Sequence, residues 1–415
     1  MTAAQSQTPP LTGRILVTLI FCALFMLIEG LDLASMPLAV PRISAAWGMP
    51  AFAFALSLSA IVIGVGLAAV ALAPLGERVG RRRMIWIAGL VAALASGATA
   101  FSGSMGVLIF WRFMTGLGLG ACLPNVTACV VQIAPVAGRS RILAAVNTAI
   151  PVGGVLAGFL MAPLVRIGHW QALFLAVAAL TVFCSLALRL LLPATNGQPA
   201  EQAPHGGAGL PLRELLSREH LFKTVLLIGL GTANTFLLYL LINWLPTLLP
   251  RAGVSLDAAA RMSGLFQLGG IFGGFVFAYL IDKNRPVRAF LCGYGLALMT
   301  LGIMFVPGLS APVWAATVLA LGMGVSGAHV AITLFGVIFY PQRLLSSYIG
   351  VSIAVTRIGA IAGPLAGGWL LAVDSGVGSF LTGTMLGLGL CLLWVLAIAH
   401  FGHRREGNQP AALPA

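Results

Sequence analysis

The sequence has few charged residues. Only 8% of its 415 residues are Asp, Glu, Lys or Arg, and 59% are apolar. Soluble globular domains carry about 25% charged residues, so this composition excludes a water-soluble globular protein. The mean hydropathy of +1.02 indicates an integral membrane protein, because apolar runs of roughly 20 residues, long enough to cross a ~30 Å hydrocarbon core, recur along the chain.

Closely spaced cysteines are also absent. The six cysteines lie inside apolar segments and none stands at metal-ligand spacing from another, so no disulfide framework and no metal site is predicted. We expect them to be small packing residues. No cofactor is implied. The first apolar run lacks a small-residue cleavage site and is interpreted as a retained helix, not a removed signal peptide.

Twelve apolar runs predict an all-α membrane protein with twelve transmembrane helices in two six-helix halves. The N-terminal half is expected at 1–193 and the C-terminal half at 222–415, joined by a polar cytoplasmic linker at 194–221. The predicted spans are 15–39, 53–75, 84–101, 107–134, 142–165, 171–193, 222–249, 259–281, 289–306, 311–340, 348–373 and 380–401.

The distribution of basic residues predicts the orientation. The net charge of +13 does not indicate nucleic-acid binding, because the Lys and Arg residues lie in short loops between apolar runs. With the N-terminus inside, 17 of them face the cytoplasm and 4 face the opposite side. The positive-inside rule therefore predicts that both termini are cytoplasmic, in a multi-pass protein of the inner (cytoplasmic) membrane.

Two pairs of matching motifs indicate that the halves are related. Glu77 and Asp282, 205 positions apart, each open a basic loop. The segment 151–154 resembles 364–368, with an offset of 213, since each has a proline followed by paired glycines. Offsets near half the chain length predict a duplicated six-helix unit, as in many secondary transporters.

Two carboxylates stand inside an apolar run. Eight of the ten acidic residues lie in loops or tails, and the exceptions are Glu29 and Asp32 in the first span. A carboxylate at the bilayer centre costs about 2.5–3.5 kcal/mol, so it is expected to be functional. Their spacing puts both on one helical face. Two neighbouring carboxylates resist double ionisation, so one can carry a proton. The alternative is a static ion pair with an intramembrane arginine.

Two arginines also lie within spans. Arg112 precedes a run of glycines that lets another helix approach, which makes it a candidate charge partner for Glu29 or Asp32 in proton coupling. Alternatively, its side chain extends to the membrane interface. Arg357 lies about ten residues into the eleventh span, and its forked guanidinium suits bidentate binding of a substrate carboxylate.

Four further residues are candidates for the substrate site. His329 is a histidine well inside the tenth span and can bind a phenol or carboxylate, titrate, or simply join two helices by a hydrogen bond. Tyr239 and Asn243 stand one turn apart in the seventh span, with Trp244 beside them. Aromatic residues in spans also serve as packing or interfacial anchors.

The loop after the second span combines Glu77 and Arg78 with Gly80 and Arg81. An acid near a helix start is favoured by the helix dipole, and the arginines can form ion pairs with another loop. We therefore expect the loop to take part in gating. Positive-inside orientation alone would explain the arginines but not the glutamate.

These motifs resemble those of the major facilitator superfamily. The loop at Glu77 resembles the superfamily signature, with Ala73 at the usual first glycine and glutamate at the usual aspartate. The second copy runs from Asp282 to Arg288, and both of these residues are gating candidates. The glycine run after Arg112 resembles the span-four signature. The resemblance implies the two-half, twelve-helix fold of that superfamily.

Over nearly its full length the chain resembles the aromatic acid:proton symporters, with the 3-(3-hydroxyphenyl)propionate transporter branch the most similar. The matching segments are Glu29 to Asp32, Leu123 to Asn125, Asn243 to Leu249, and Arg357 to Pro364. In the family, the span-one acids and the span-eleven arginine are associated with transport. The resemblance implies import of a small aromatic carboxylate, such as a hydroxyphenylpropionate or hydroxybenzoate, together with protons, and adds Asn125 to the candidate substrate-binding residues.

The principal alternative is a proton-coupled antiporter or efflux pump of the same fold for other small organic molecules. Arg357 favours an anionic substrate over a cationic one. An enzyme is not predicted, because the spans contain no nucleophile–base pair and no cluster of metal ligands. The expected partners are the substrate, protons and the lipid bilayer, and the protein is expected to be a monomer.

Overall fold

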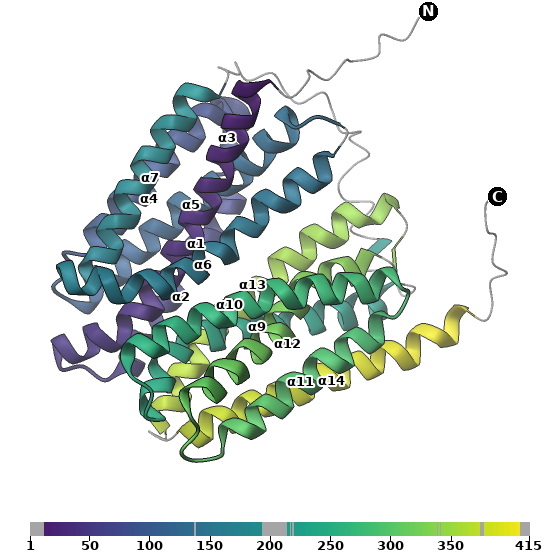
Figure 1. Ribbon diagram of the computed structural model, residues 1–415. Coiled ribbons are helices and arrows are strands. Elements are labelled where there is room, and N and C mark those ends of the chain that lie inside the picture. The colour runs from purple at the N-terminus through teal and green to yellow at the C-terminus, as the bar shows by residue number, and fades with distance from the viewer. Residues whose placement is uncertain are drawn as a thin grey trace, which may run out of the picture. The chain divides into compact units, whose positions relative to one another are not determined.

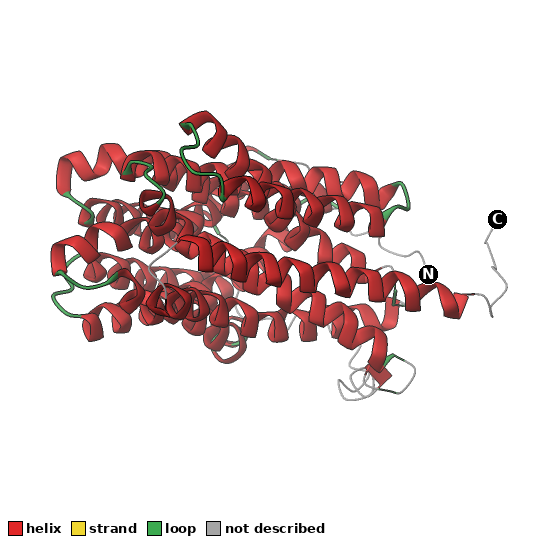
Figure 2. Ribbon diagram, turned by 90° about the horizontal axis from the view of Figure 1, so that it is seen from below, coloured by secondary structure: helices red, strands yellow, loops and turns green. Residues whose placement is uncertain are grey.

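The computed structural model describes residues 12–136, 138–192, 214–215, 217, 220–337, 339–340, 342–373 and 377–406. Within these ranges the regular elements are helices, and no strand occurs (Figure 2). The predicted all-α fold is therefore confirmed. Most of the predicted linker, 194–221, lies outside the described residues.

The chain forms two compact units (Figure 1). The first contains the helices up to α7, apart from the short stretch Ala51–Ala55, which is assigned to the second unit. Its helices are α1 (Gly13–Trp47), α2 (Ala55–Ala71), α3 (Leu75–Val79), α4 (Arg81–Thr99), α5 (Met105–Ile133), α6 (Arg139–Gly168) and α7 (Gln171–Leu191). The 3-10 helix η1 (Ala51–Phe54), which leads into α2, lies in the stretch assigned to the second unit.

The second unit contains six long helices. They are α9 (Leu221–Arg251), α10 (Leu256–Asp282), α11 (Pro286–Met304), α12 (Ala311–Val337), α13 (Gln342–Val373) and α14 (Val377–Glu406). Each of these helices corresponds to one predicted span, and so does each of the six long helices of the first unit.

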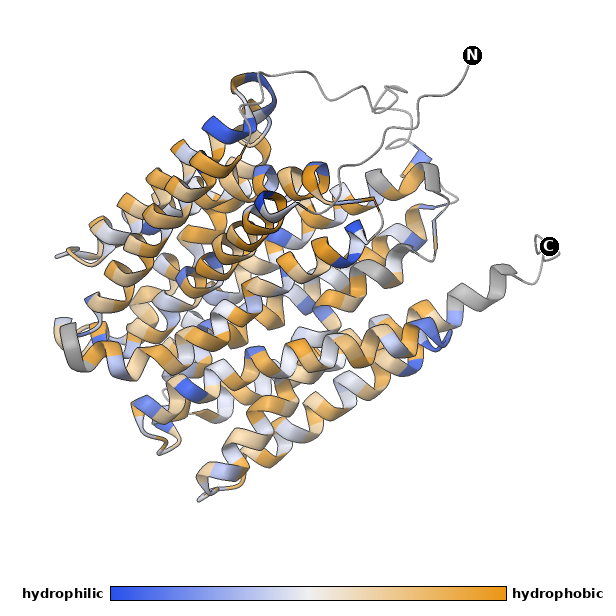
Figure 3. Ribbon diagram, turned by 45° about the horizontal axis from the view of Figure 1, so that its top comes forward, coloured by the Kyte–Doolittle hydropathy of each residue, from blue (hydrophilic) through white to orange (hydrophobic). Residues whose placement is uncertain are grey.

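Eleven helices in the described part of the chain are long and apolar enough to cross a membrane. Apolar residues predominate along the helices of each unit (Figure 3). The long helix that falls short is α4, because it begins with Arg81, Arg82 and Arg83 and any stretch of it long enough to span a membrane includes at least two of these arginines. The protein is thus a multi-pass membrane protein.

Helix α1 is longer than its predicted span. The sequence places the end of the first span at residue 39, but the helix continues through Pro41 to Trp47 and ends at Gly48, whose φ of 63° is left-handed. Proline is tolerated in transmembrane helices because neighbouring groups satisfy the freed backbone positions. The last two turns contain Arg42 and Ser44. Because these residues are polar, the apolar run ends before the helix does, and the predicted span was too short.

The two units use the same helix pairs. In the first unit α1 packs on α6 and α7, and α4 packs on α5 and α7. In the second unit α9 packs on α13 and α14, and α11 packs on α12 and α14. Since α1 corresponds to α9 and α6 to α13, the packing pattern repeats from one unit to the other.

Glycines make the closest contacts of both patterns. Gly153 of α6 lies against the backbone of Leu27 and Leu31 in α1, and Gly359 of α13 lies against the backbone of Thr232 and Phe236 in α9. At each position an added Cβ would overlap backbone atoms of the neighbouring helix. Small residues allow this approach, and helices in lipid associate through such packing.

These contacts give the repeat offset as 205 or 206 residues. Gly153 and Gly359 are 206 positions apart, and so are Gly116 of α5 and Gly322 of α12, which lie against α2 and α10 in the same way. The offset of 213 suggested by 151–154 and 364–368 is therefore wrong for the glycines that join the helices. That match arose because Gly and Pro are frequent in this sequence.

We predict that Gly153→Ala and Gly359→Ala both lower the thermal stability of the purified protein. The new methyl group forces two helix backbones apart, and such overpacking costs about 1–3 kcal/mol. Gly302→Ala in α11 is the control, because an added Cβ there meets nothing within 4 Å. The measurement is the unfolding midpoint in detergent. A midpoint for Gly359→Ala equal to that of Gly302→Ala would contradict the role given to the close contact.

Candidate functional site

A buried ion pair lies inside the first unit. Arg112 Nη1 of α5 donates to Asp32 Oδ1 of α1 at 2.9 Å, and Arg112 Nη2 donates to the backbone oxygen of Asp32 at 3.2 Å. The Arg112 side chain is fully buried and Asp32 is 3% exposed. Arg112 therefore does not extend to the membrane interface, and the charge-partner interpretation of this arginine describes its observed contact.

Other groups complete the surroundings of the pair. Ser96 of α4 donates to Asp32 Oδ1 at 3.1 Å, and the Arg112 guanidinium lies 5.5 Å from the centre of the Phe174 ring of α7. Arg112 Nε has no hydrogen-bond partner among the described residues. Asp32 thus accepts from Arg112 through both its carboxylate and its backbone oxygen, while the guanidinium keeps an unused donor at Nε.

Glu29 lies one turn before Asp32 in α1 and is also buried, at 5% exposure. Gly30 between them lies against the backbone of Ile150 in α6, where no larger residue fits. The close approach of α6 excludes lipid from this face of α1. Both acids predicted for proton coupling are therefore inside the protein, and Asp32 of α1 is bonded by side chains from α4 and α5.

Asn125 has a structural role in the loop after α2. Its Nδ2 donates to the backbone oxygens of Ala73 and Ala121 at 3.1 and 2.8 Å. A Cβ on Gly76 would overlap the Asn125 carboxamide. Asn125 thus fastens the loop before the short helix α3 to α5. Its predicted part in substrate binding stays a prediction.

The gating candidates of that loop make few contacts within their unit. Glu77 lies 4.0 Å from Arg81, and its side chain is 65% exposed. Exposed pairs of this kind contribute about 0–1 kcal/mol. Gly80 between α3 and α4 has φ of 92°, which favours glycine. Among the described residues, Arg78, Asp282 and Arg288 have no ion-pair partner within their own units.

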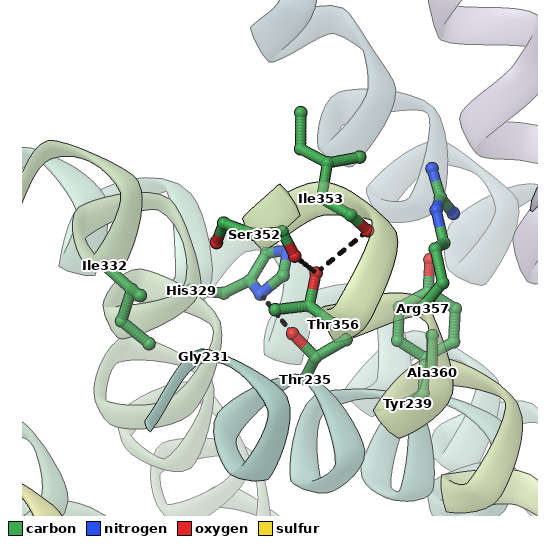
Figure 4. A pocket seen from close by; sticks show the side chains of 10 residues that line it. All are labelled: Gly231, Thr235, Tyr239, His329, Ile332, Ser352, Ile353, Thr356, Arg357 and Ala360. Atoms are coloured by element: carbon green, nitrogen blue, oxygen red, sulfur yellow. Dashed lines mark hydrogen bonds between the residues drawn. The ribbon is translucent and has the colours of Figure 1, made fainter. Parts of the chain in front are cut away.

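The second unit contains a polar cavity of about 170 Å³ between α9, α12 and α13. Arg357, His329 and Tyr239 line it, as the sequence predicts for substrate-binding residues (Figure 4). The other lining residues are Gly231, Thr235, Ile332, Ser352, Ile353, Thr356 and Ala360. Gly359 and Gly363 bring α13 against α9 next to the cavity.

Some polar side chains of the cavity have hydrogen-bond partners among the described residues of this unit, and Arg357 does not. His329 Nδ1 lies 3.3 Å from Thr235 Oγ1, and Thr356 donates to the backbone oxygens of Ser352 and Ile353. Arg357 is half-buried and has no hydrogen bond or ion pair with a described residue of this unit. A positive charge without a counter-ion therefore borders the cavity.

Asn243 and Trp244 lie outside the cavity lining. Asn243 Nδ2 donates to the backbone oxygen of Tyr239, and Trp244 Nε1 donates to the backbone oxygen of Pro364 at 2.9 Å. Trp244 is fully buried against Gly367. Asn243 therefore bonds the preceding turn of its own helix, α9, and Trp244 joins α9 to α13.

Sequence reasoning missed two tyrosines next to the cavity. Tyr348 is fully buried against Gly336, and the Tyr340 ring stacks on it with centres 4.7 Å apart. Tyr340 also shares a 2.7 Å hydrogen bond with Thr224 of α9. Burial raises the pKa of Tyr340 above its usual 10, so its hydroxyl stays neutral. Tyr348 stands one turn before Ser352, which lines the cavity.

The architecture defines the class of protein. Two related helical units, a buried charge pair in one and a polar cavity in the other are features of a secondary transporter. In the described part of the chain no group of three or more His, Cys, Asp or Glu residues is placed to hold a metal ion. The chain belongs to the Major Facilitator Superfamily, whose sequence pattern it matches over residues 19–352.

Three proteins with similar sequences are transporters of aromatic acids. The gallate transporter of Pseudomonas putida is 32% identical, over 97% of this chain and 95% of that protein. The 3-(3-hydroxy-phenyl)propionate transporter of Escherichia coli is 30% identical, over 97% of each chain. A 4-hydroxybenzoate transporter of Pseudomonas aeruginosa is 28% identical, over 94% of this chain and 93% of that protein. The predicted superfamily is confirmed.

Solved structures agree on the fold. An inward-facing, unoccupied bacterial homologue of the human lysosomal transporter Spinster gives a TM-score of 0.74 at 15% identity, covering 97% of this chain and all of that one. A D-xylose–proton symporter gives 0.71 at 17% identity, covering 92% and 97%. At such identities the likeness extends to the fold alone.

We predict that Arg112→Gln destabilises the protein by about 3–5 kcal/mol, because it leaves the Asp32 carboxylate buried without its partner. The double variant with Asp32→Asn should recover part of this loss, since both charges are then removed. Arg14→Gln is the control, because Arg14 is exposed. Unfolding midpoints in detergent provide the measurement, and equal midpoints for Arg112→Gln and Arg14→Gln would show that the ion pair does not stabilise the fold.

Proposed function

We propose that this protein imports small aromatic carboxylates together with protons across the inner membrane. The observation that carries the proposal is Arg357, an intramembrane cation that lines a cavity of single-ring size and has no ion-pair partner among the described residues of its unit. The substrates named for the three relatives support it, because each of these molecules contains a single aromatic ring and a carboxylate.

Arg357 is the proposed carboxylate clamp. Moving an ion out of water costs several kcal/mol unless a partner compensates the charge. A planar guanidinium offers two parallel donors to a carboxylate, which a single ammonium group does not. Tyr239, also in the cavity lining, supplies an aromatic surface for the ring. His329 completes the proposed site at the opposite side of Thr356 (Figure 4).

Asp32 and Arg112 are the proposed coupling pair, with Glu29 as the second acid. A proton that binds Asp32 removes the negative partner of Arg112 and leaves the guanidinium bonded only to neutral groups. The energy of this pair therefore depends on whether the proton is present, and a ligand shifts a conformational equilibrium only through such a difference. The loop residues Glu77, Arg78, Gly80 and Arg81 and the segment from Asp282 to Arg288 are proposed to take part in gating.

The orientation follows from the distribution of arginine and lysine. With 17 basic residues on one side and 4 on the other, both termini are proposed to lie in the cytoplasm of a bacterial cell. The protein is proposed to act as a monomer, because each unit already contains its own packed helices. Substrate, protons and lipid are then its only required partners.

We predict that Arg357→Ala weakens binding of 4-hydroxybenzoate by about 2–5 kcal/mol, as for removing one side of a buried charge pair. Arg357→Lys should weaken binding less, because it keeps the charge but loses the fork. Isothermal calorimetry on 4-hydroxybenzoate and on its uncharged amide provides the test. If Arg357→Ala weakens both ligands equally, the arginine is structural and the clamp is wrong.

We predict that Asp32→Asn abolishes uphill uptake driven by a proton gradient and leaves most of the ligand binding. Asparagine keeps the shape of the side chain but cannot release a proton. Uptake of labelled 4-hydroxybenzoate into proteoliposomes, with and without an imposed pH gradient, provides the measurement. Undiminished accumulation by the variant would remove Asp32 from the coupling mechanism and leave Glu29 as the candidate.

A further inference from the structure

The polar groups of the cavity in the second unit are divided between two sides. Figure 4 shows the Arg357 guanidinium on one side of Thr356 and the His329 ring on the other. Ile332, Ile353 and Ala360 add apolar surface to the lining. A ligand that satisfies both sides must carry one polar group for Arg357, a second for His329, and an apolar body between them.

His329 is held at its side of the cavity by Thr235. The two side chains, from α12 and α9, are joined by the 3.3 Å contact between Nδ1 and Oγ1. Nε2 has no hydrogen-bond partner among the described residues of this unit, although the ring lines the cavity. The contact with Thr235 fixes which ring nitrogen is left for a ligand.

Either tautomer of His329 suits a hydroxyl group. If the Thr235 hydroxyl donates to Nδ1, Nε2 carries the proton and donates to the ligand oxygen. If Nδ1 donates to Thr235, Nε2 accepts a hydrogen bond from the ligand hydroxyl. A hydroxyl can do both, whereas a carboxylate only accepts and an ammonium only donates.

The other hydroxyl near His329 does not compete for the ligand. Thr356 already donates to the backbone of its own helix, at 2.8 Å to Ser352 and 3.2 Å to Ile353. Its methyl group lies against Gly231, where an added Cβ would meet it at 3.0 Å. Thr356 therefore lies between the two polar sides with its hydroxyl already bonded, and His329 Nε2 is a polar atom on the far side that has no partner among the described residues of this unit.

The cavity volume limits the size of the ligand. An engineered cavity of about 150 Å³ in another protein is known to hold one benzene ring. The cavity here, at about 170 Å³, accommodates a single ring with small substituents. Two fused rings do not fit without movement of the helices.

We propose that His329, positioned by Thr235, is the specificity-determining residue that recognises a ring hydroxyl on the side of the aromatic acid away from its carboxylate. The substrate class is therefore a single-ring carboxylate with a hydroxyl meta or para to the carboxylate-bearing carbon. This inference rests on the proposed function, because Arg357 must hold the carboxylate for the hydroxyl to reach His329.

The test compares benzoate with 3- and 4-hydroxybenzoate in the wild type and in His329→Phe. A site built to bind a hydroxyl rejects an analogue without it, because its own polar group is left unpaired. We expect the wild type to bind at least one hydroxybenzoate about tenfold or more tightly than benzoate. In His329→Phe this ratio should fall to about one, with benzoate binding changed by less than about threefold.

Two further variants keep the test informative if His329→Phe does not fold. Thr235→Val should reduce the hydroxyl preference by freeing the imidazole, while His329→Gln, which retains a donor and an acceptor, should preserve part of it. Thr384→Val is the matched control, because Thr384 is buried and its hydroxyl bonds the backbone of Phe380 in α14. This control should leave the preference unchanged.

The outcomes separate the two proposals. A wild type that binds neither benzoate nor either hydroxybenzoate overturns the proposed function and this inference with it. A wild type that binds benzoate and the hydroxybenzoates equally, or a hydroxyl preference that persists in His329→Phe and Thr235→Val, overturns only the role of His329. In that case the histidine serves as a hydrogen bond between α9 and α12.

Discussion

The ion pair between Asp32 and Arg112 is the interaction on which the first unit depends. Both side chains are excluded from solvent, and a buried charge is tolerated only when it is paired and hydrogen-bonded. Ser96 and the Asp32 backbone oxygen supply these bonds, and the glycine contacts of α1 with α6 exclude lipid. A single proton on Asp32 changes the charge balance of the whole cluster, which makes this pair the proposed coupling element.

The two units share a scaffold but not its chemistry. At the repeat offset of 205 or 206, Asn234 stands where the first unit has Glu29, and Val318 stands where it has Arg112. Asn234 accepts a hydrogen bond from Tyr294 and carries no charge. Within the described spans of the second unit, Arg357 is the charge that borders the cavity. The two units thus share one packing plan, and the proposed proton coupling and ligand binding fall in different units.

The sequence predicted the parts of this account that depend on local composition. Apolar runs located each long helix, and the scarcity of intramembrane charges identified Asp32, Arg112 and Arg357. It did not identify Thr235 or Tyr348, because threonine and tyrosine in a span are common and become informative only through contacts with distant residues. Asn125 and Trp244 were candidates for ligand binding from a motif, but a motif does not tell whether a side chain faces a cavity or a neighbouring backbone.

The movement of protons with substrate tests the central claim most directly. Purified protein in liposomes, loaded with a pH-sensitive dye and with no imposed gradient, is given 4-hydroxybenzoate outside, and protein-free liposomes correct for passive entry of the acid. Symport predicts that the lumen becomes more acidic as the substrate enters, at a rate above that of the protein-free control. A lumen that becomes more alkaline, or keeps its pH while protein-dependent uptake proceeds, would contradict proton-coupled import.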